Sequence, residues 1–405
     1  MKALFLTNEY PPHVYGGAGI HVDYLTRELA KSIQVEVRCF GDQKEHKNNL
    51  LIKGYDYVRE MFAACDPKLK SPLSALSRCI DFNADAVDSS VVHCHTWYSH
   101  FGGILAKMGY GIPLVITTHS LEPLRPWKRE QIGLGYEISS WIERTALNMA
   151  DALIAVSREM KADIIKLFNV PENKIRVIYN GIDTEEFKPV DSRNILIKYG
   201  IDPGIPYVLF VGRVTRQKGI IHLVNAIKYL DKKTQVVLVA GQPDTREIGV
   251  EMGEKVAQVQ KKRKNVIWIR EWVDIKSKIE LYSGAAVFCC PSIYEPFGII
   301  NLEAMACATP VVGSCVGGIK EIIEHGITGR LVAMEQHSTS PFEPVNPDKF
   351  SFDLAQGINE IINDKSMQEN MGQASRQRAE KHFSWRTVAG ETINLYNSLL
   401  SKRNK

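Results

Sequence analysis

Two glutamates in the stretch Ser292–Ala308, Glu295 and Glu303, bracket a turn and the start of a helix. Pro296 disfavours a helical backbone at the residue before it, so Glu295 is expected on a loop. A helix is expected from about Ile299, which puts Glu303 near its first turn. Free N–H groups and the positive dipole end of such a helix suit phosphate or sugar hydroxyls. The alternative is a solvated loop acid and a glutamate that only favours the helix dipole.

A basic pair forms the second candidate group. Arg213 and Lys218 lie between an expected buried strand, Tyr207–Val211, and a helix from Ile220 to Leu230. The turn resembles a phosphate loop but is not a Walker A sequence, because its lysine precedes the last glycine and no Ser or Thr follows to hold magnesium. Both cations would therefore bind a diphosphate directly, in place of a metal. Ordinary surface cations are the alternative.

A glycine turn near the amino terminus is the third candidate. Gly16 and Gly17 follow an expected strand, Ala3–Thr7, and precede a helix, so their N–H groups could approach a phosphate closely. The dinucleotide fingerprint is incomplete, because Val22 stands where its third glycine belongs. A nicotinamide-dependent oxidoreductase is therefore disfavoured, and a plain tight turn is the other alternative.

Histidines end two further expected strands. His119 follows the strand Pro113–Thr118, and the carboxyl end of a parallel strand is well placed for chemistry. His93 and His95 share one face of the strand Val91–His95, which is a metal-like geometry. The sequence shows no third ligand beside them, so structural histidines are favoured and no metal site is predicted.

Strands and helices alternate twice along the 405 residues, which predicts an α/β protein with two parallel-sheet domains. Residues 188–206 contain three prolines and two glycines and are predicted to lead into the second domain. The predicted domains are residues 1–188 and 189–384, and a final helix follows Ser384.

Composition excludes several classes of protein. The 50 basic and 46 acidic residues give a net charge of only +4, which does not indicate a nucleic-acid partner. The eight cysteines form no C-x-x-C pair and are interpreted as buried thiols in a reducing compartment. The sequence shows no secretory signal pattern and no apolar run near the ~18 residues of a membrane helix. A cytoplasmic protein without a membrane span is expected.

Taken together, the motifs closely resemble one family, the retaining family-4 glycosyltransferases of the glycogen and sucrose-phosphate synthase type. The resemblance covers nearly the whole chain and rests on Tyr15-Gly16-Gly17, His119, Gly212-Arg213 with Lys218-Gly219, and Glu295-x7-Glu303. It implies the GT-B fold, in which two Rossmann-like parallel-sheet domains face a central cleft. Three longer stretches are similar to the branch of bacterial glycogen synthases and α-maltose-1-phosphate synthases, which use ADP-glucose: residues 9–19, 118–128 and 294–308.

The resemblance implies a role for each residue of the sugar-donor site. Gly16 and Gly17 would face the donor phosphates, and His119 would lie beside the donor sugar. Arg213 and Lys218 would hold the diphosphate and stabilise the leaving nucleotide. Glu295 would contact the glucose hydroxyls, and Glu303 would accept hydrogen bonds from the ribose. Backbone N–H groups would assist Glu295 at Phe297, Gly298 and Ile299. The implied catalytic set is His119, Arg213, Lys218 and Glu295.

The resemblance implies that the first domain binds the acceptor. The final helix, residues 385–401, would complete that domain. The acceptor would meet a face that contains Trp97, Tyr98, Arg125 and Lys128. Within the loop Ser120–Lys128, the basic and aromatic residues suit an anionic or sugar ligand, with an ordinary surface loop as the alternative.

The predicted function is a retaining glucosyltransferase that moves glucose from a nucleotide-glucose, with ADP-glucose favoured. The acceptor is an α-1,4-glucan, as in glycogen synthase, or glucose 1-phosphate. The residues do not decide between these two acceptors or between ADP and UDP in the donor, and they do not indicate the oligomeric state. Because two cations can stabilise the leaving diphosphate, no metal and no cofactor are predicted. Only one carboxylate remains near the sugar, so a front-face substitution is favoured over double displacement. A GT-B enzyme that makes another glycoside, with a lipid or an osmolyte, and a non-catalytic nucleotide-sugar-binding protein are the alternatives.

Overall fold

The computed structural model describes residues 1–56, 59–241, 243–338 and 342–403, which form two compact units. The first unit is Met1–Gly181 with Trp385–Lys405, and the second is Ile182–Ser384. The division therefore falls at residues 181/182 rather than at 188/189. Residues from 182 onward belong to the second unit because the Ile182 N–H donates to the Phe383 carbonyl at 2.7 Å, and the Arg376 guanidinium donates to the Phe187 carbonyl at 2.6 Å.

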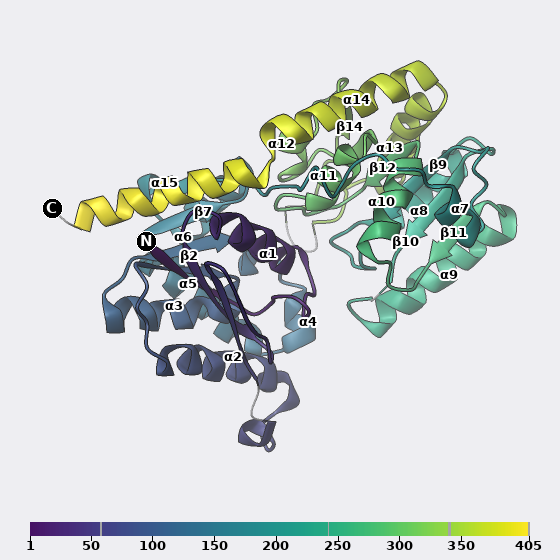
Figure 1. Cartoon of the computed structure of the whole chain (residues 1–405). Coiled ribbons are helices and arrows are strands. Elements are labelled where there is room, and N and C mark those ends of the chain that lie inside the picture. Colours follow the sequence, from purple (N-terminus) through teal and green to yellow (C-terminus); the bar gives the residue numbers. More distant parts are fainter. Residues whose placement is uncertain (57–58, 242, 339–341, 404–405) are drawn as a thin grey trace. The chain divides into compact units, whose positions relative to one another are not determined.

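The described part of the first unit contains an eight-stranded sheet with the order β3-β4-β2-β1-β5-β6-β7-β8. Figure 1 labels β2 and β7 of this sheet. All neighbouring strands run parallel except β3 and β4. The strands are β1 Lys2–Thr7, β2 Gln34–Phe40, β3 Lys44–Lys47, β4 Leu50–Tyr55, β5 Val91–His95, β6 Leu114–Thr118, β7 Ala152–Ala155 and β8 Ile175–Val177. The helices are α1 Gly17–Leu29, α2 Pro67–Ala84, α3 Trp97–Tyr110, α4 Lys128–Ile132, α5 Gly135–Met149, α6 Arg158–Phe168 and α15 Trp385–Arg403.

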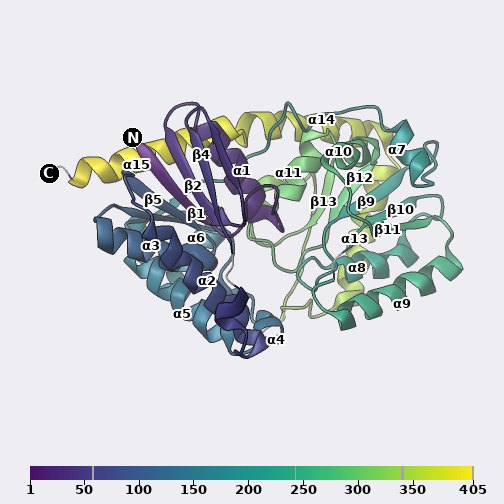
Figure 2. The same ribbon diagram turned by 60° about the horizontal axis from the view of Figure 1, so that its bottom comes forward.

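Alternate residues of the central strands pack against different helices, as period-two side-chain direction requires. Ala3 and Phe5 of β1 pack on the face that α1 and α15 cover. Leu4 and Leu6 pack on the opposite face, against α2, α3, α5 and α6. Figure 2 shows α1 and α15 on one side of these strands and α2, α3 and α5 on the other. The sheet is thus buried on both faces, as the continuous apolar runs predict.

The described part of the second unit contains a six-stranded parallel sheet with the order β11-β10-β9-β12-β13-β14. Its strands are β9 Tyr207–Val211, β10 Gln235–Val239, β11 Val266–Ile269, β12 Val287–Cys290, β13 Val311–Ser314 and β14 Gly329–Val332. Its helices are α7 Arg193–Lys198, α8 Ile220–Ala226, α9 Arg246–Lys262, α10 Ile275–Gly284, α11 Ile299–Ala306, α12 Ile319–Ile322, α13 Pro347–Ile362 and α14 Lys365–His382.

Two segments differ from the sequence prediction. No strand is predicted in the polar stretch after Lys44, yet it forms the antiparallel pair β3 and β4 at the sheet edge. The side chains of β3 are exposed, so no apolar alternation marks the strand. The expected lead-in to the second domain contains a short helix, α7.

The strand order places the candidate residues. In each sheet the chain reverses its direction of winding beside the first strand of that unit: between β1 and β5 in the first, and between β9 and β12 in the second. In open parallel sheets, ligands bind at the carboxyl ends of the strands at such a switch point. The switch points predict one binding edge on each unit. Among the described residues, no helix combines the length and apolar character needed to cross a bilayer.

Candidate active site

Lys218 and Glu295 meet at the switch point of the second sheet. Lys218 lies in the turn after β9, and Glu295 lies in the loop after β12. The Lys218 ammonium donates to Glu295 Oε2 at 2.6 Å, and Ser292 Oγ donates to the same oxygen at 3.2 Å. Both side chains are largely buried. The structure therefore joins one predicted cation and one predicted carboxylate that lie 77 residues apart.

Two glycines allow the loops around the Lys218–Glu295 pair to pack closely against neighbouring backbone. A Cβ at Gly219 would lie 2.0 Å from the Pro291 carbonyl oxygen, and its φ is +60°. A Cβ at Gly317 would lie 2.0 Å from the Glu295 carbonyl oxygen, and its φ is +50°. That carbonyl also accepts the Gly318 N–H at 2.9 Å. Larger residues would collide with backbone at both positions, so the glycines fix the distance between the Lys218 turn and the Glu295 loop.

Arg213, the other predicted cation, has a carboxylate partner that the sequence reasoning missed. Its guanidinium donates to Asp244 Oδ1 at 2.6 Å. Asp244 follows β10, the strand beside β9, so its carboxylate reaches the same edge of the sheet. An arginine has five N–H donors, so this contact leaves others for an anion.

Glu303 lies directly after the first turn of α11, close to its expected place, because the helix begins at Ile299 as predicted. Its side chain is 3% exposed. Lys278 donates to Oε1 at 3.0 Å, and the Tyr282 hydroxyl donates to Oε2 at 2.9 Å. Burial, together with the neighbouring Glu303 charge, raises the pKa of Tyr282 well above its ordinary value, so the hydroxyl stays protonated as a donor. These two contacts rule out the alternative that Glu303 is an acid that only favours the helix dipole.

The start of α11 is built as the sequence predicted. Gly298 caps the helix with a φ of 105°, a conformation that favours glycine. Phe297 is buried and packs edge-on against Phe383, which holds the loop in place. The N–H groups of the first helical turn from Ile299 have no carbonyl partner within the helix, as at any helix start.

At the switch point of the first sheet, a carboxylate lies on the glycine turn. Glu9 Oε2 accepts the N–H of Gly16 at 2.7 Å and the N–H of Tyr15 at 2.8 Å. Gly16 caps α1, and a Cβ there would point into open space. The carboxylate thus lies where the sequence predicts a phosphate, at a helix N-terminus that stabilises negative charge. Neither composition nor spacing identified Glu9.

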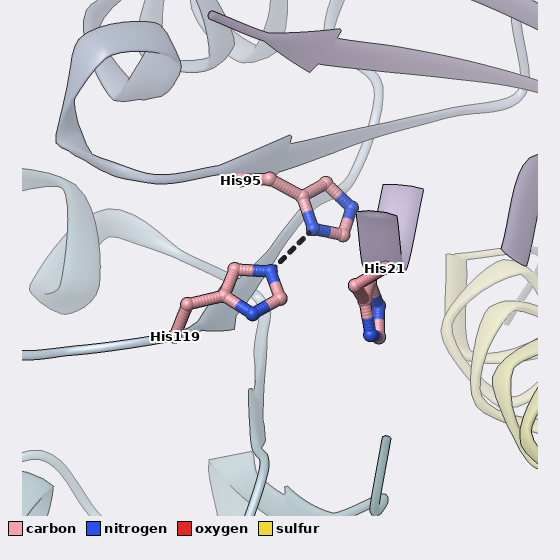
Figure 3. Close-up of side chains that lie close together, drawn as sticks. All are labelled: His21, His95 and His119. Carbon is pink, nitrogen blue, oxygen red and sulfur yellow. Dashed lines mark hydrogen bonds between the residues drawn. The ribbon is translucent and has the colours of Figure 1, made fainter. Parts of the chain in front are cut away.

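His119 lies at the end of β6, as predicted, and contacts a second histidine. Its Nε2 lies 3.0 Å from Nδ1 of His95, which ends the neighbouring strand β5 (Figure 3). His21 of α1 packs edge-on against His119, with ring centroids 4.7 Å apart. Burial lowers the pKa of His21 to about 4 and the pKa values of His95 and His119 well below their ordinary range. All three rings are therefore neutral at pH 7.

His93, in contrast, is a satisfied structural histidine, as the sequence favoured. Its Nδ1 lies 2.6 Å from the Tyr396 hydroxyl, and its Nε2 lies 2.7 Å from Thr117 Oγ1. Tyr396 belongs to α15, so this contact joins the final helix to the sheet of the first unit.

The four residues predicted to contact the acceptor differ in their solvent exposure. Trp97 is buried and stacks on the half-buried Tyr98, with ring centroids 4.0 Å apart. Arg125 is half-buried and donates to Ser120 Oγ at 3.2 Å. Lys128 does not project from a surface loop: it is 8% exposed and its ammonium donates to Glu122 Oε1 at 2.7 Å.

Lys128 belongs to a buried polar network. Ser139 Oγ donates to the other oxygen of Glu122, and Glu143 accepts the Glu122 backbone N–H, each at 2.8 Å. Burial and the nearby Glu122 charge raise the pKa of Glu143 well above its ordinary value. The Lys128 charge is largely offset within this network, which leaves Arg125 as the more accessible cation of the predicted pair.

Comparisons with known proteins agree with this arrangement. Residues 15–186 match the family model described as "Glycosyltransferase Family 4", and residues 191–341 match "Glycosyl transferases group 1". The chain is 42% identical to an alpha-maltose-1-phosphate synthase of Mycolicibacterium smegmatis, over 98% of this chain and 100% of the relative. It is 28% identical to a glycogen synthase of Mycobacterium tuberculosis, over 100% of this chain and 95% of that protein.

Among solved structures, the fold is similar to a sucrose-phosphate synthase from Thermosynechococcus elongatus. The TM-score is 0.79, and the match at 25% identity covers 99% of this chain and 100% of that one. The chain therefore belongs to the family-4 glycosyltransferases and has the GT-B fold. It is a hexosyltransferase, which confirms the predicted family, fold class and enzyme class.

Proposed function

We propose that the protein is a retaining glucosyltransferase that takes glucose from ADP-glucose and transfers it to glucose 1-phosphate. The observation that supports it best is the Lys218–Glu295 pair at the switch point of the second sheet. Relatives named alpha-maltose-1-phosphate synthase, at 42% identity, favour glucose 1-phosphate as acceptor over the α-glucan suggested by the more distant glycogen synthase.

In the proposed reaction, the bond between the glucosyl carbon and the diphosphate oxygen breaks as the acceptor hydroxyl forms the new bond on the same face. Negative charge develops on the departing nucleoside diphosphate, and the acceptor proton passes to it. Lys218 and Arg213 would stabilise this charge without a metal ion, because both are cations at the carboxyl edge of the sheet and can donate several charged hydrogen bonds.

Glu295 would position the sugar. Lys218 and Ser292 both contact its Oε2, which leaves Oε1 for a glucose hydroxyl. Glu303 would bind the ribose hydroxyls through its remaining lone pairs, and its contact with Lys278 would hold the carboxylate in place. His119 would lie beside the sugar, and Arg125 would bind the acceptor phosphate.

A matrix of sugar donors and acceptors tests the proposal. Purified protein is mixed with ADP-glucose or UDP-glucose and with glucose 1-phosphate, glycogen or no acceptor, and release of the nucleoside diphosphate is followed. The expected result is fast release only with ADP-glucose and glucose 1-phosphate, with a phosphorylated α-disaccharide as product. A β-linked product would contradict retention, and absence of release from every pair would contradict the function.

The acceptor requires its own comparison, because a glucan remains the second candidate. Faster release with glycogen than with glucose 1-phosphate would favour the glycogen synthase alternative, which the 28% identical relative supports. Arg125→Ala should raise the KM for glucose 1-phosphate and leave the KM for ADP-glucose close to the wild-type value. Arg144→Ala, at an exposed arginine on α5, provides the matched control.

A further inference from the structure

Three histidines from separate elements converge in the first unit. His21 comes from α1, His95 from the end of β5, and His119 from the residue after β6. One ring nitrogen from each lies within 4.8 Å of the other two (Figure 3). We propose that His21, His95 and His119 form a binding site for a transition-metal ion such as Zn²⁺. The proposed metal site shares His119 with the proposed sugar site, but it is tested by metal binding and does not depend on transfer activity.

The spacing of the nitrogens is close to that of a tetrahedral site. Zinc binds imidazole nitrogen at about 2.0–2.1 Å, which separates two ligand nitrogens by roughly 3.3 Å. His95 Nδ1 and His119 Nε2 are 3.0 Å apart, so a slight opening would admit the ion. The His21 ring must approach by roughly an ångström more to reach the same spacing.

The ionisation state also suits ligation. An imidazole must be neutral to bind a metal, and burial lowers the pKa values of all three rings. At 3.0 Å, one proton lies between His95 Nδ1 and His119 Nε2. For both atoms to bind the ion, that proton must move to the other nitrogen of its own ring, so binding at pH 7 needs no net proton release.

Unmatched polar atoms provide an independent indication of a ligand. Neither ring nitrogen of His21 has a hydrogen bond to a described residue, and neither has His95 Nε2. The buried Asn180 lies near the His21 ring and favours its charged form, yet its Oδ1 also has no hydrogen bond to a described residue. Buried polar atoms usually have partners, and an ion-binding role is one accepted explanation for an exception.

The surroundings would hold two of the ligand rings in place. His95 stacks on Phe5, with centroids 5.5 Å apart, and lies 4.4 Å from the His93 ring. His93 is fixed in turn by Tyr396 and Thr117. His21 packs edge-on against Trp385 at 5.3 Å. Three protein ligands leave the fourth tetrahedral position to a water or a substrate oxygen, and the half-buried His119 marks the accessible side.

Ligand chemistry selects the ion. Three neutral imidazoles suit Zn²⁺, Cu²⁺, Ni²⁺ or Co²⁺ better than Mg²⁺ or Ca²⁺, which prefer oxygen ligands. This inference differs from the sequence-based expectation of no metal site. The third ligand was not evident because His21 lies on a helix 74 positions before His95 in the chain.

The test measures metal binding directly. The full-length protein is stripped with a chelator and dialysed against buffered free Zn²⁺, and bound metal is counted. We expect about one ion per chain in the wild type and none in His21→Gln or His95→Gln. His46→Gln, at an exposed histidine of β3, should retain the ion, as should Cys65→Ser combined with Cys315→Ser, which removes the two accessible thiols.

Two measurements keep the result decisive if a variant folds poorly. Zn²⁺ should raise the Tm of the wild type but not of His21→Gln, because an ion that binds only the folded state stabilises it. Co²⁺ bound to the wild type should show the visible bands of tetrahedral nitrogen ligation without a thiolate charge-transfer band. Absence of binding to the wild type, retention of the ion in both histidine variants, or a thiolate band would overturn the proposal.

Discussion

The binding edges of the two sheets bury polar groups in opposite ways. In the second unit, Lys218 and Arg213 lie 2.6 Å from the carboxylates of Glu295 and Asp244, respectively. In the first unit, the histidines at the equivalent edge are neutral, and several ring nitrogens have no hydrogen bond within the described chain. A buried charge must be paired, whereas an imidazole avoids the cost of a buried charge by giving up its proton.

The difference indicates different ligands. Paired cations can turn from a carboxylate to a phosphate, so the second edge suits an anion whose charge grows during reaction. Neutral imidazoles attract no anion strongly but bind metal ions through their lone pairs. The same topological position thus supports two chemistries, and three experiments test the contrast.

The largest expected effect is on turnover, and it follows from removing Lys218 at the binding edge of the second sheet. Lys218→Ala should lower kcat about 10²–10³-fold, because one preorganised donor to the developing charge is lost. The KM for the sugar donor should change much less. Steady-state kinetics with the best substrates of the acceptor matrix measures both values.

Controls separate chemistry from folding. Lys218→Gln keeps an N–H donor to Glu295 and should fold like the wild type but remain slow. Lys228→Ala removes an exposed lysine that also pairs with a carboxylate, Asp348, and should keep full activity. A wild-type kcat in Lys218→Ala would remove the proposed role in leaving-group stabilisation.

The next effect is a loss of stability in acid, confined to the first unit. Burial lowers the pKa values of five of its histidines: His21, His93, His95, His100 and His119. As pH falls from about 6.5 to about 4, the unfolded chain takes up protons that the folded chain does not bind. Stability is therefore fully present above about pH 6.5 and falls by about 1.4 kcal/mol per pH unit for each such histidine.

Hydrogen exchange resolved by peptide measures this effect in each unit separately. At pH 5, β5 and β6 should lose protection before β9 and β12, with exposure times scaled for the intrinsic pH dependence of exchange. His100→Leu should weaken the pH dependence, because it removes one buried imidazole outside the proposed metal site. The raised pKa values of Glu143 and Glu391 act in the opposite direction, but they are two groups against five. Equal loss of protection in both units would contradict the expectation that buried neutral histidines make only the first unit sensitive to acid.

The smallest expected effect concerns Glu303. Glu303→Gln should raise the KM for the sugar donor about tenfold, the loss expected when a charged hydrogen-bond acceptor becomes neutral. Turnover should stay close to the wild-type value, because the ribose is remote from the bond that breaks. Glu280→Gln, on α10 near Lys278, is the matched control. A lower kcat with an unchanged KM would show that Glu303 acts on the chemical step instead.

Much of the fold was predictable from local pattern. Continuous apolar runs such as residues 207–211 predicted buried parallel strands, and the structure confirms this strand and its parallel pairing. The edge hairpin β3 and β4 was missed, because its exposed polar strands carry no apolar alternation. The start of α11 at Ile299 was predicted, because Pro296 and Gly298 mark the end of the preceding turn.

The amino-acid sequence by itself determined the elements, the family, and the turns that carry Arg213, Lys218 and Glu295. These features are local, because a strand, a turn and a helix start each depend on residues that are neighbours in the chain. Tertiary structure decided the partners: Glu9 on the glycine turn, Asp244 with Arg213, Lys278 with Glu303, Glu122 with buried Lys128, and His21 beside His95 and His119. Strand order brings these residues together, and strand order depends on burying both faces of each sheet rather than on any single motif.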